Sequence, residues 1–141
     1  MTESSARAGL FIIHTGDGKG KTTAALGLMV RAWGRGKSVK MFQFLKHTGA
    51  RFGEHRAAEK FGLSIESRGD GFTWLSKDMD ETTAIAVDQW ERCKAAIQAG
   101  DTDLVILDEA TYPVTYGWLD ADDVVSTIAN RPRRGHGSRR A

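Results

Sequence analysis

Short apolar runs alternate with longer amphipathic stretches along this chain, which is the pattern of strands and helices in turn. The runs that predict buried strands lie at residues 10–14, 39–45, 63–66 and 104–107. Met41, Phe42 and Phe44 make the second run nearly continuous in apolar residues. Such a run is typical of a strand covered on both faces, as in a parallel sheet.

Apolar residues at three- and four-residue spacing predict the helices between these runs. The expected helices lie at residues 20–33, 54–61 and 78–99, with a short one that Asp120 caps and that ends near Asn130. Residues 111–118 are expected to form an aromatic-rich loop. Strands that alternate with helices predict an α/β fold, with a parallel sheet, flanking helices and right-handed crossovers.

Composition divides the 141 residues into one domain at 10–130, a polar arm at 1–9 and a tail at 131–141. The tail carries five arginines and almost no apolar residue, so both ends are expected to be disordered. Net charge is +2, but residues 1–130 hold 15 basic and 18 acidic side chains. This mildly acidic body argues against nucleic-acid binding outside the tail, and the tail itself has no interleaved aromatic residues for stacking on bases.

The number of cysteines, the spacing of the histidines and the lack of a long apolar segment limit the class of protein further. Cys93 is the one cysteine in the sequence, which excludes an internal disulfide and a cysteine-based zinc site. His14, His47, His55 and His136 show no metal-ligand spacing and are assigned no role. The polar start and the lack of a long apolar segment predict a cytoplasmic protein without a membrane span.

A glycine-rich stretch follows the first apolar run and precedes the first helical pattern. Strand, glycine loop and helix is the context of a phosphate-binding P-loop, in which backbone N–H groups and the helix N-terminus bind anions. Lys21 can reach the outer phosphates of a nucleotide, and the Thr22 hydroxyl can ligate Mg²⁺. The candidate binding residues are Gly16, Asp17, Gly18, Lys19, Gly20, Lys21, Thr22 and Thr23. Three residues separate Gly16 from Gly20 where the usual motif has four, and Thr15 stands where the first glycine would be, so the loop is expected to be shorter than usual.

A second candidate element is the apolar run at 104–107, which ends in Asp108 and Glu109. A carboxylate at the carboxyl end of a neighbouring strand can hold the Mg²⁺ of a P-loop protein, directly or through water. Asp108 and Glu109 are both candidates by position. The chain has no Asn-Lys-x-Asp guanine-reading motif and no protein-kinase signature, so these residues indicate nucleotide binding without choosing the reaction.

Several stretches together resemble the P-loop corrinoid adenosyltransferases, the ATP:cob(I)alamin and cob(I)yrinic acid a,c-diamide enzymes. The matching stretches are 15–23 with its short spacing, Gln43-Phe-Leu-Lys46, Gly71-Phe-Thr-Trp74, Leu107-Asp-Glu-Ala-Thr-Tyr112 and Asn130-Arg-Pro132. The resemblance runs from about residue 9 to 132 and implies a RecA-like P-loop NTPase fold. It also implies transfer of the 5′-deoxyadenosyl group of ATP to the Co(I) of a reduced corrinoid, with release of triphosphate.

That activity fits the residues, because Co(I) is itself the nucleophile and the protein needs none of its own. The resemblance assigns Phe72 and Trp74 to displacing the lower axial ligand of cobalt, and Lys21 to the triphosphate. It favours Glu109 as the metal ligand, whereas chain position favours Asp108. Tyr112, Tyr116 and Trp118 are expected to pack within their loop, or to form a wall of the corrinoid pocket.

The resemblance also implies the cofactors and partners: ATP, Mg²⁺ with Mn²⁺ as the alternative, the corrinoid, an electron-donating flavoprotein reductase and a homodimer. The sequence leaves open which corrinoid is preferred. Past Pro132 it departs from the family pattern and lacks the expected C-terminal strand, as in a truncated or frame-shifted product. Two other functions therefore remain: another P-loop ATPase or kinase, or an ATP-binding remnant without turnover.

Overall fold

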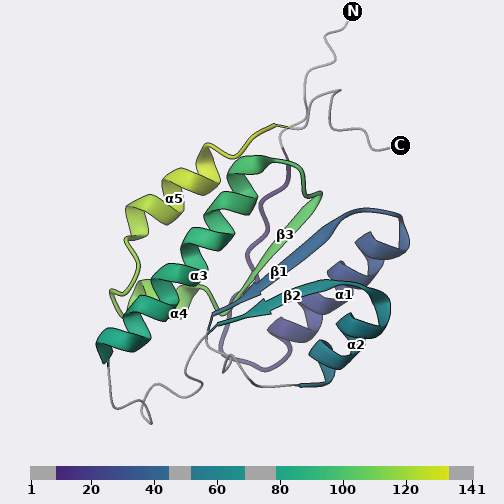
Figure 1. Cartoon of the computed structure of the whole chain (residues 1–141), viewed down its shortest axis with the longest axis horizontal. Coiled ribbons are helices and arrows are strands. Elements are labelled where there is room, and N and C mark those ends of the chain that lie inside the picture. The colour runs from purple at the N-terminus through teal and green to yellow at the C-terminus, as the bar shows by residue number, and fades with distance from the viewer. Residues whose placement is uncertain (1–8, 45–51, 69–78, 134–141) are drawn as a thin grey trace, which may run out of the picture.

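The computed structural model describes residues 9–44, 52–68 and 79–133 (Figure 1). In chain order its elements are α1 (Lys21–Gly34), β1 (Val39–Gln43), α2 (Gly53–Phe61), β2 (Ser64–Ser67), α3 (Met79–Ala99), β3 (Leu104–Asp108), α4 (Thr111–Thr115) and α5 (Ala121–Ala129). No helix within the described residues is long and apolar enough to cross a bilayer.

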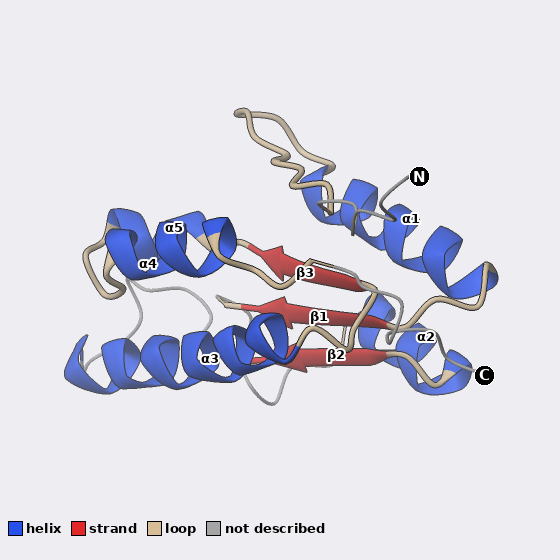
Figure 2. Ribbon diagram, turned by 90° about the horizontal axis from the view of Figure 1, so that it is seen from above, coloured by secondary structure: helices blue, strands red, loops and turns tan. Residues whose placement is uncertain are grey.

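The strands of the described residues form one parallel sheet in the order β2-β1-β3, with β1 in the centre. Helices α1 and α2 cover one face of this sheet, and α3 and α5 cover the other (Figures 1 and 2). The predicted α/β class with a parallel sheet and flanking helices is confirmed. The connection from β1 to β2 passes through α2, and the connection from β2 to β3 passes through α3, as parallel strands require.

Alternate residues of β1 pack against the two helical layers. Met41 is fully buried in a cluster with Met29 of α1, and Phe42 is buried in a second cluster with Trp90 and Cys93 of α3. The period of two in strand side chains produces this division, and it places Gln43 on the same face as Met41. Burial raises the pKa of the Cys93 thiol to about 12, so this cysteine is a packing residue rather than a nucleophile.

The strand expected at residues 10–14 is wrong. These residues have no helix or strand assignment, and the side chains of Leu10 and Ile13 are 89% and 65% exposed. A strand needs a neighbour to pair its backbone N–H and C=O groups, and in the described sheet β1 pairs with β2 and β3 alone. An apolar run predicts burial, but it does not supply the pairing partner.

The loop expected at 111–118 also differs, because its first half folds as the short helix α4. Aromatic content suggested a loop, yet local bonds close a turn there, including one from the Tyr116 N–H to the Tyr112 carbonyl. The helices expected at 20–33, 54–61 and 78–99 are confirmed within about one residue. The strand expected at 39–45 begins at Val39 as expected and ends at Gln43.

Some expectations fall on residues that the structure does not describe. Phe72 and Trp74 lie outside the described residues, as do the arm at 1–8 and the tail at 134–141. Residues 131–133 are described: the Arg131 guanidinium donates to the carbonyl of Ile128, and Pro132 lies against Gly100. The disordered arm and tail stay predictions.

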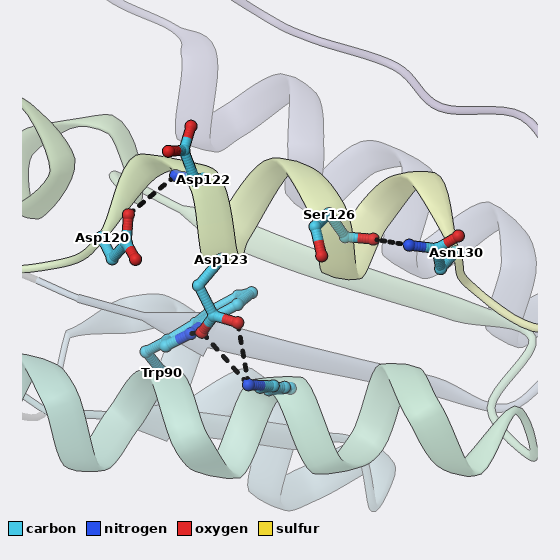
Figure 3. Close-up of polar contacts among 7 residues, drawn as sticks. Trp90, Asp120, Asp122, Asp123, Ser126 and Asn130 are labelled. Carbon is cyan, nitrogen blue, oxygen red and sulfur yellow. Dashed lines mark hydrogen bonds and ion pairs between the residues drawn. The ribbon is translucent and has the colours of Figure 1, made fainter.

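Helices α3 and α5 are joined by a polar contact around Asp123 (Figure 3). Its carboxylate accepts hydrogen bonds from Trp90 Nε1 at 2.8 Å and from Lys94 Nζ at 2.9 Å. The Trp90 bond and then the Lys94 bond hold the pKa of Asp123 below its ordinary value. Asp120 caps α5 as expected, with its side chain accepting from the Asp122 N–H.

We expect Asp123→Asn to lower the stability of the chain in a pH-dependent way. Because the pKa of Asp123 is lowered by folding, its carboxylate stabilises the folded state above the pKa of a free aspartate, about 3.9. That stabilisation is lost as the pH falls through the lower folded value. Urea midpoints should therefore differ between parent and variant at pH 7, and the difference should shrink on acidification. Asp122→Asn, on the exposed side of the same turn, is the control; an equal gap at every pH would contradict the expectation.

Candidate nucleotide site

The glycine loop leads directly into the N-terminus of α1. Gly20 is the N-cap residue, and its φ of 108° lies in the left-handed region that favours glycine, as does the φ of 126° at Gly16. Apart from adjacent residues of the chain, no atom lies within 4 Å of a Cβ built at either position. The loop is therefore an open, solvent-exposed turn in front of the unpaired N–H groups of a helix, a position that favours anions.

Lys21, the first residue of α1, folds its side chain back into this loop. Its Nζ donates to the carbonyl of Gly16 at 2.6 Å and to that of Gly18 at 2.7 Å. The ammonium group is thus already inside the turn, beside the backbone that a phosphate would meet. Sequence analysis predicted a role for Lys21 in the loop, and the geometry places its charge there.

Thr22 connects the loop to the sheet. Its hydroxyl donates to the Asp108 carboxylate, 3.0 Å from Oδ1 and 3.2 Å from Oδ2, across 86 residues of sequence. Asp108 is the last residue of β3 and is 6% exposed. Asp108 is therefore in contact with the residue that follows the candidate lysine of the loop.

Glu109 follows directly, with a φ of 60°. This is the left-handed region, which non-glycine residues rarely adopt and which is often found at functional sites. Glu109 forms the turn between β3 and α4, and it is partly buried.

The Asp108 carboxylate is the end of a row of polar side chains that crosses the carboxyl edge of the sheet. The parallel register sets Asp108 beside Gln43 and Gln43 beside Ser67, so the three side chains share one face. Gln43 Nε2 donates to Asp108 Oδ2 at 3.2 Å, and Ser67 Oγ donates to Gln43 Oε1 at 2.7 Å. His55 of α2 closes the row, with Nε2 at 2.7 Å from both Gln43 Oε1 and Ser67 Oγ. We call Asp108, Gln43, Ser67 and His55 the edge row.

Sequence analysis assigned no function to Gln43, Ser67 or His55. The available signal was Gln43, a polar residue between Phe42 and Phe44 of an apolar run, because a buried amide needs partners. The partners themselves depend on strand register, which the sequence did not supply.

The aromatic residues after β3 contact one another through their rings. The ring centroids of Tyr112 and Tyr116 are 6.4 Å apart, and those of Tyr116 and Trp118 are 5.0 Å apart. Tyr112 and Tyr116 remain about half exposed. The expected local packing of these residues is confirmed by the ring contacts, and the alternative role as a wall of the corrinoid pocket stays a prediction.

The donors beside the loop fit a magnesium ion. Mg²⁺ prefers oxygen ligands and is usually held by one or two protein side chains together with water and nucleotide phosphates. The Thr22 hydroxyl and the Asp108 carboxylate are two such oxygen donors, next to the turn where phosphates would lie. Within the described ranges, no three His, Cys, Asp or Glu side chains gather into a metal cluster.

A glycine loop before a helix, with its threonine bonded to a carboxylate at the carboxyl end of a parallel strand, is an arrangement typical of P-loop proteins of the α/β class. Comparison with known proteins gives the family within that class. A family model described as ATP:corrinoid adenosyltransferase BtuR/CobO/CobP matches residues 7–136. The chain belongs to this family.

Named relatives agree with the family match. The chain is 37% identical over 134 residues to "Corrinoid adenosyltransferase" of Escherichia coli (strain K12), covering 95% of this chain and 68% of that protein. It is 38% identical over 136 residues to "Corrinoid adenosyltransferase CobA" of Salmonella typhimurium, covering 96% and 68%. The similar protein of Pseudomonas aeruginosa is 35% identical over 138 residues, again covering 96% and 68%.

Proposed function

We propose that this chain transfers the 5′-deoxyadenosyl group of ATP to the Co(I) of a corrinoid, releasing triphosphate. The observation that carries the proposal is the Thr22–Asp108 contact behind the glycine loop, in a chain that belongs to the ATP:corrinoid adenosyltransferase family. In this reaction a Co–C bond forms as the C5′–O bond breaks, and the electron pair of that bond leaves with the triphosphate. Cobalt rises formally from Co(I) to Co(III).

The chain's own task is to bind and orient ATP and to stabilise the leaving group. Loop N–H groups and the Lys21 ammonium would neutralise the triphosphate, and the start of α1 adds partial positive charge. Thr22 and Asp108 would hold Mg²⁺, which supplies further positive charge to the leaving oxygen when bound. Holding C5′ in line with cobalt is a matter of positioning, which contributes strongly to rate without a protein nucleophile.

The remaining parts of the proposal come from family resemblance. Phe72 and Trp74 would act on the lower face of the corrinoid, and a flavoprotein reductase would supply the electron for Co(I). Mn²⁺ is an alternative to Mg²⁺, the protein would work in the cytoplasm, and two chains would form a homodimer. Phe72 and Trp74 lie outside the described residues, and the metal, the reductase, the location and the homodimer are likewise proposals that rest on the family.

An anaerobic assay with chemically reduced cobalamin, ATP and Mg²⁺ tests the proposal. We expect the Co(I) absorbance to disappear while adenosylcobalamin and triphosphate appear in equal amounts. Release of inorganic phosphate without alkylation of cobalt would instead support a general P-loop ATPase. Binding of ATP with no product of either kind would support a binding remnant without turnover.

A further inference from the structure

Gln43 is the central member of the edge row, and nothing in the proposed chemistry so far uses it. Its side chain is 0% exposed, and it lies on the central strand between the two strands that pair with it. Burying an amide is costly unless both its ends are bonded. Both ends of this amide are bonded, one toward Asp108 and the other toward α2.

The contacts of the Asp108 carboxylate are unequal. The Thr22 hydroxyl lies at nearly the same distance from both oxygens, 3.0 and 3.2 Å, so it does little to set the rotation of the group. Gln43 Nε2 bonds to Oδ2. This second donor bonds one oxygen and not the other, so it distinguishes the two oxygens where the Thr22 hydroxyl does not. Rotation of the carboxylate about its Cβ–Cγ bond is therefore set from the Gln43 side.

The orientation of the Gln43 amide is itself fixed by α2 and β2. His55 Nδ1 accepts from the backbone N–H of Phe52 at 2.9 Å, so the ring proton of the neutral imidazole is on Nε2. That proton and the Ser67 hydroxyl both face Gln43 Oε1. A flipped amide would set its NH₂ group against the His55 N–H and its oxygen against the carboxylate, and both contacts would be repulsive.

We propose that Gln43 is a positioning residue that fixes the Asp108 carboxylate for a nucleotide-bound magnesium ion, and that His55 and Ser67 lock its amide in the donating orientation. The inference rests on the proposed function in taking Asp108 as the carboxylate beside that ion. It extends the site from the glycine loop across the sheet to α2. Partners that orient metal ligands typically change metal affinity or activity by about 10- to 100-fold when removed.

The test replaces Gln43 by methionine, which has a similar length and no hydrogen-bonding amide. Calorimetry on the full chain measures ATP binding over a range of MgCl₂ concentrations and again in EDTA. The quantity compared is the Mg²⁺ requirement, which is the Mg²⁺ concentration that produces half of the full increase in ATP affinity. We expect Gln43→Met to raise this Mg²⁺ requirement by about 10- to 100-fold. ATP binding in EDTA should be unchanged, because Gln43 does not contact the loop.

Gln89→Met is the matched control. Gln89 is also a glutamine with 0% exposure at the same end of the sheet, but its Nε2 donates to the backbone carbonyls of Gln43 and Glu66. Its replacement should lower the urea midpoint as much as Gln43→Met does, or more, without changing the Mg²⁺ requirement. A merely structural role for Gln43 would make the two variants behave alike.

Ser67→Ala supplies a second variant, should Gln43→Met fail to fold. It removes one donor to Oε1 and should raise the Mg²⁺ requirement by a smaller factor. Added to Gln43→Met it should have no further effect, because Ser67 acts through Gln43.

Parental Mg²⁺ requirements in both Gln43→Met and Ser67→Ala would overturn the inference. So would equal losses of affinity with Mg²⁺ and in EDTA, or an ATP affinity of the parent chain that does not depend on Mg²⁺. A parent chain that binds ATP with Mg²⁺ yet alkylates no cobalt would overturn the proposed function. In that case a raised Mg²⁺ requirement in Gln43→Met would still support the role of Gln43.

Discussion

Lys21→Ala should reduce adenosyl transfer by about 100-fold or more, which is the scale of losing a donor to charge that develops in a transition state. The Lys21 ammonium lies inside the glycine loop, bonded to the carbonyls of Gly16 and Gly18. It is therefore in place before a nucleotide arrives, and its removal takes a positive charge away from both bound ATP and leaving triphosphate. Rates of adenosylcobalamin formation and calorimetric ATP affinities would show the effect.

Lys37→Ala is the control for this variant, since Lys37 is an exposed lysine just past the far end of α1. It removes the same net charge at a distance from the loop and should keep parental rates. Lys21→Arg retains the charge but not the compact ammonium, and we expect it to recover ATP binding only in part. Parental activity in Lys21→Ala would contradict the assignment of residues 16–23 to phosphate binding.

Asp108→Asn should lower Mg²⁺-dependent transfer by about 100-fold. Asparagine keeps an oxygen that can accept from the Thr22 hydroxyl, so the contact between α1 and β3 can survive while the negative charge is lost. The neutral amide is a weak ligand for Mg²⁺, and the site would need much more metal. Titration of activity with MgCl₂, alongside the urea midpoint of each variant, separates loss of metal from loss of fold.

Glu109→Gln decides between the two acidic residues that sequence analysis left open. With Asp108 as the metal ligand, this variant should show the smaller increase in Mg²⁺ requirement. A larger increase in the Mg²⁺ requirement of Glu109→Gln than of Asp108→Asn would identify Glu109 as the metal ligand. It would contradict the inference that the Asp108 carboxylate, which accepts from Thr22, holds the metal.

The sequence predicted those features of the fold that depend on local pattern. Helix periodicity located α1, α2 and α3, and the nearly continuous apolar run located the central strand β1. The prediction failed at residues 10–14, where the same kind of apolar run has exposed side chains and no strand partner. Hydrophobicity is a property of a segment, whereas strand formation is a property of a pair of segments, and the sequence alone did not show which pairs form.

The candidate site was predictable in its loop and in its acidic pair, but not in the other three members of the edge row. Lys21 and Thr22 are set by a motif with a fixed order, so their places followed from the sequence. The choice of Asp108 for the contact with Thr22, and the addition of Gln43 and His55, follow from the register of three strands and the position of α2. Register and docking are long-range features that no local spacing encodes.

The apolar side chains at residues 10–13 also bear on how this chain will behave in the laboratory. Leu10, Phe11, Ile12 and Ile13 are each more than half exposed, and β3 pairs through β1 alone among the described strands. Unpaired strand edges and exposed apolar segments can pair with the same features of other molecules and cause aggregation. Purified protein should therefore precipitate as it is concentrated. Mild solubilising additives should raise its solubility more than they raise its folding stability.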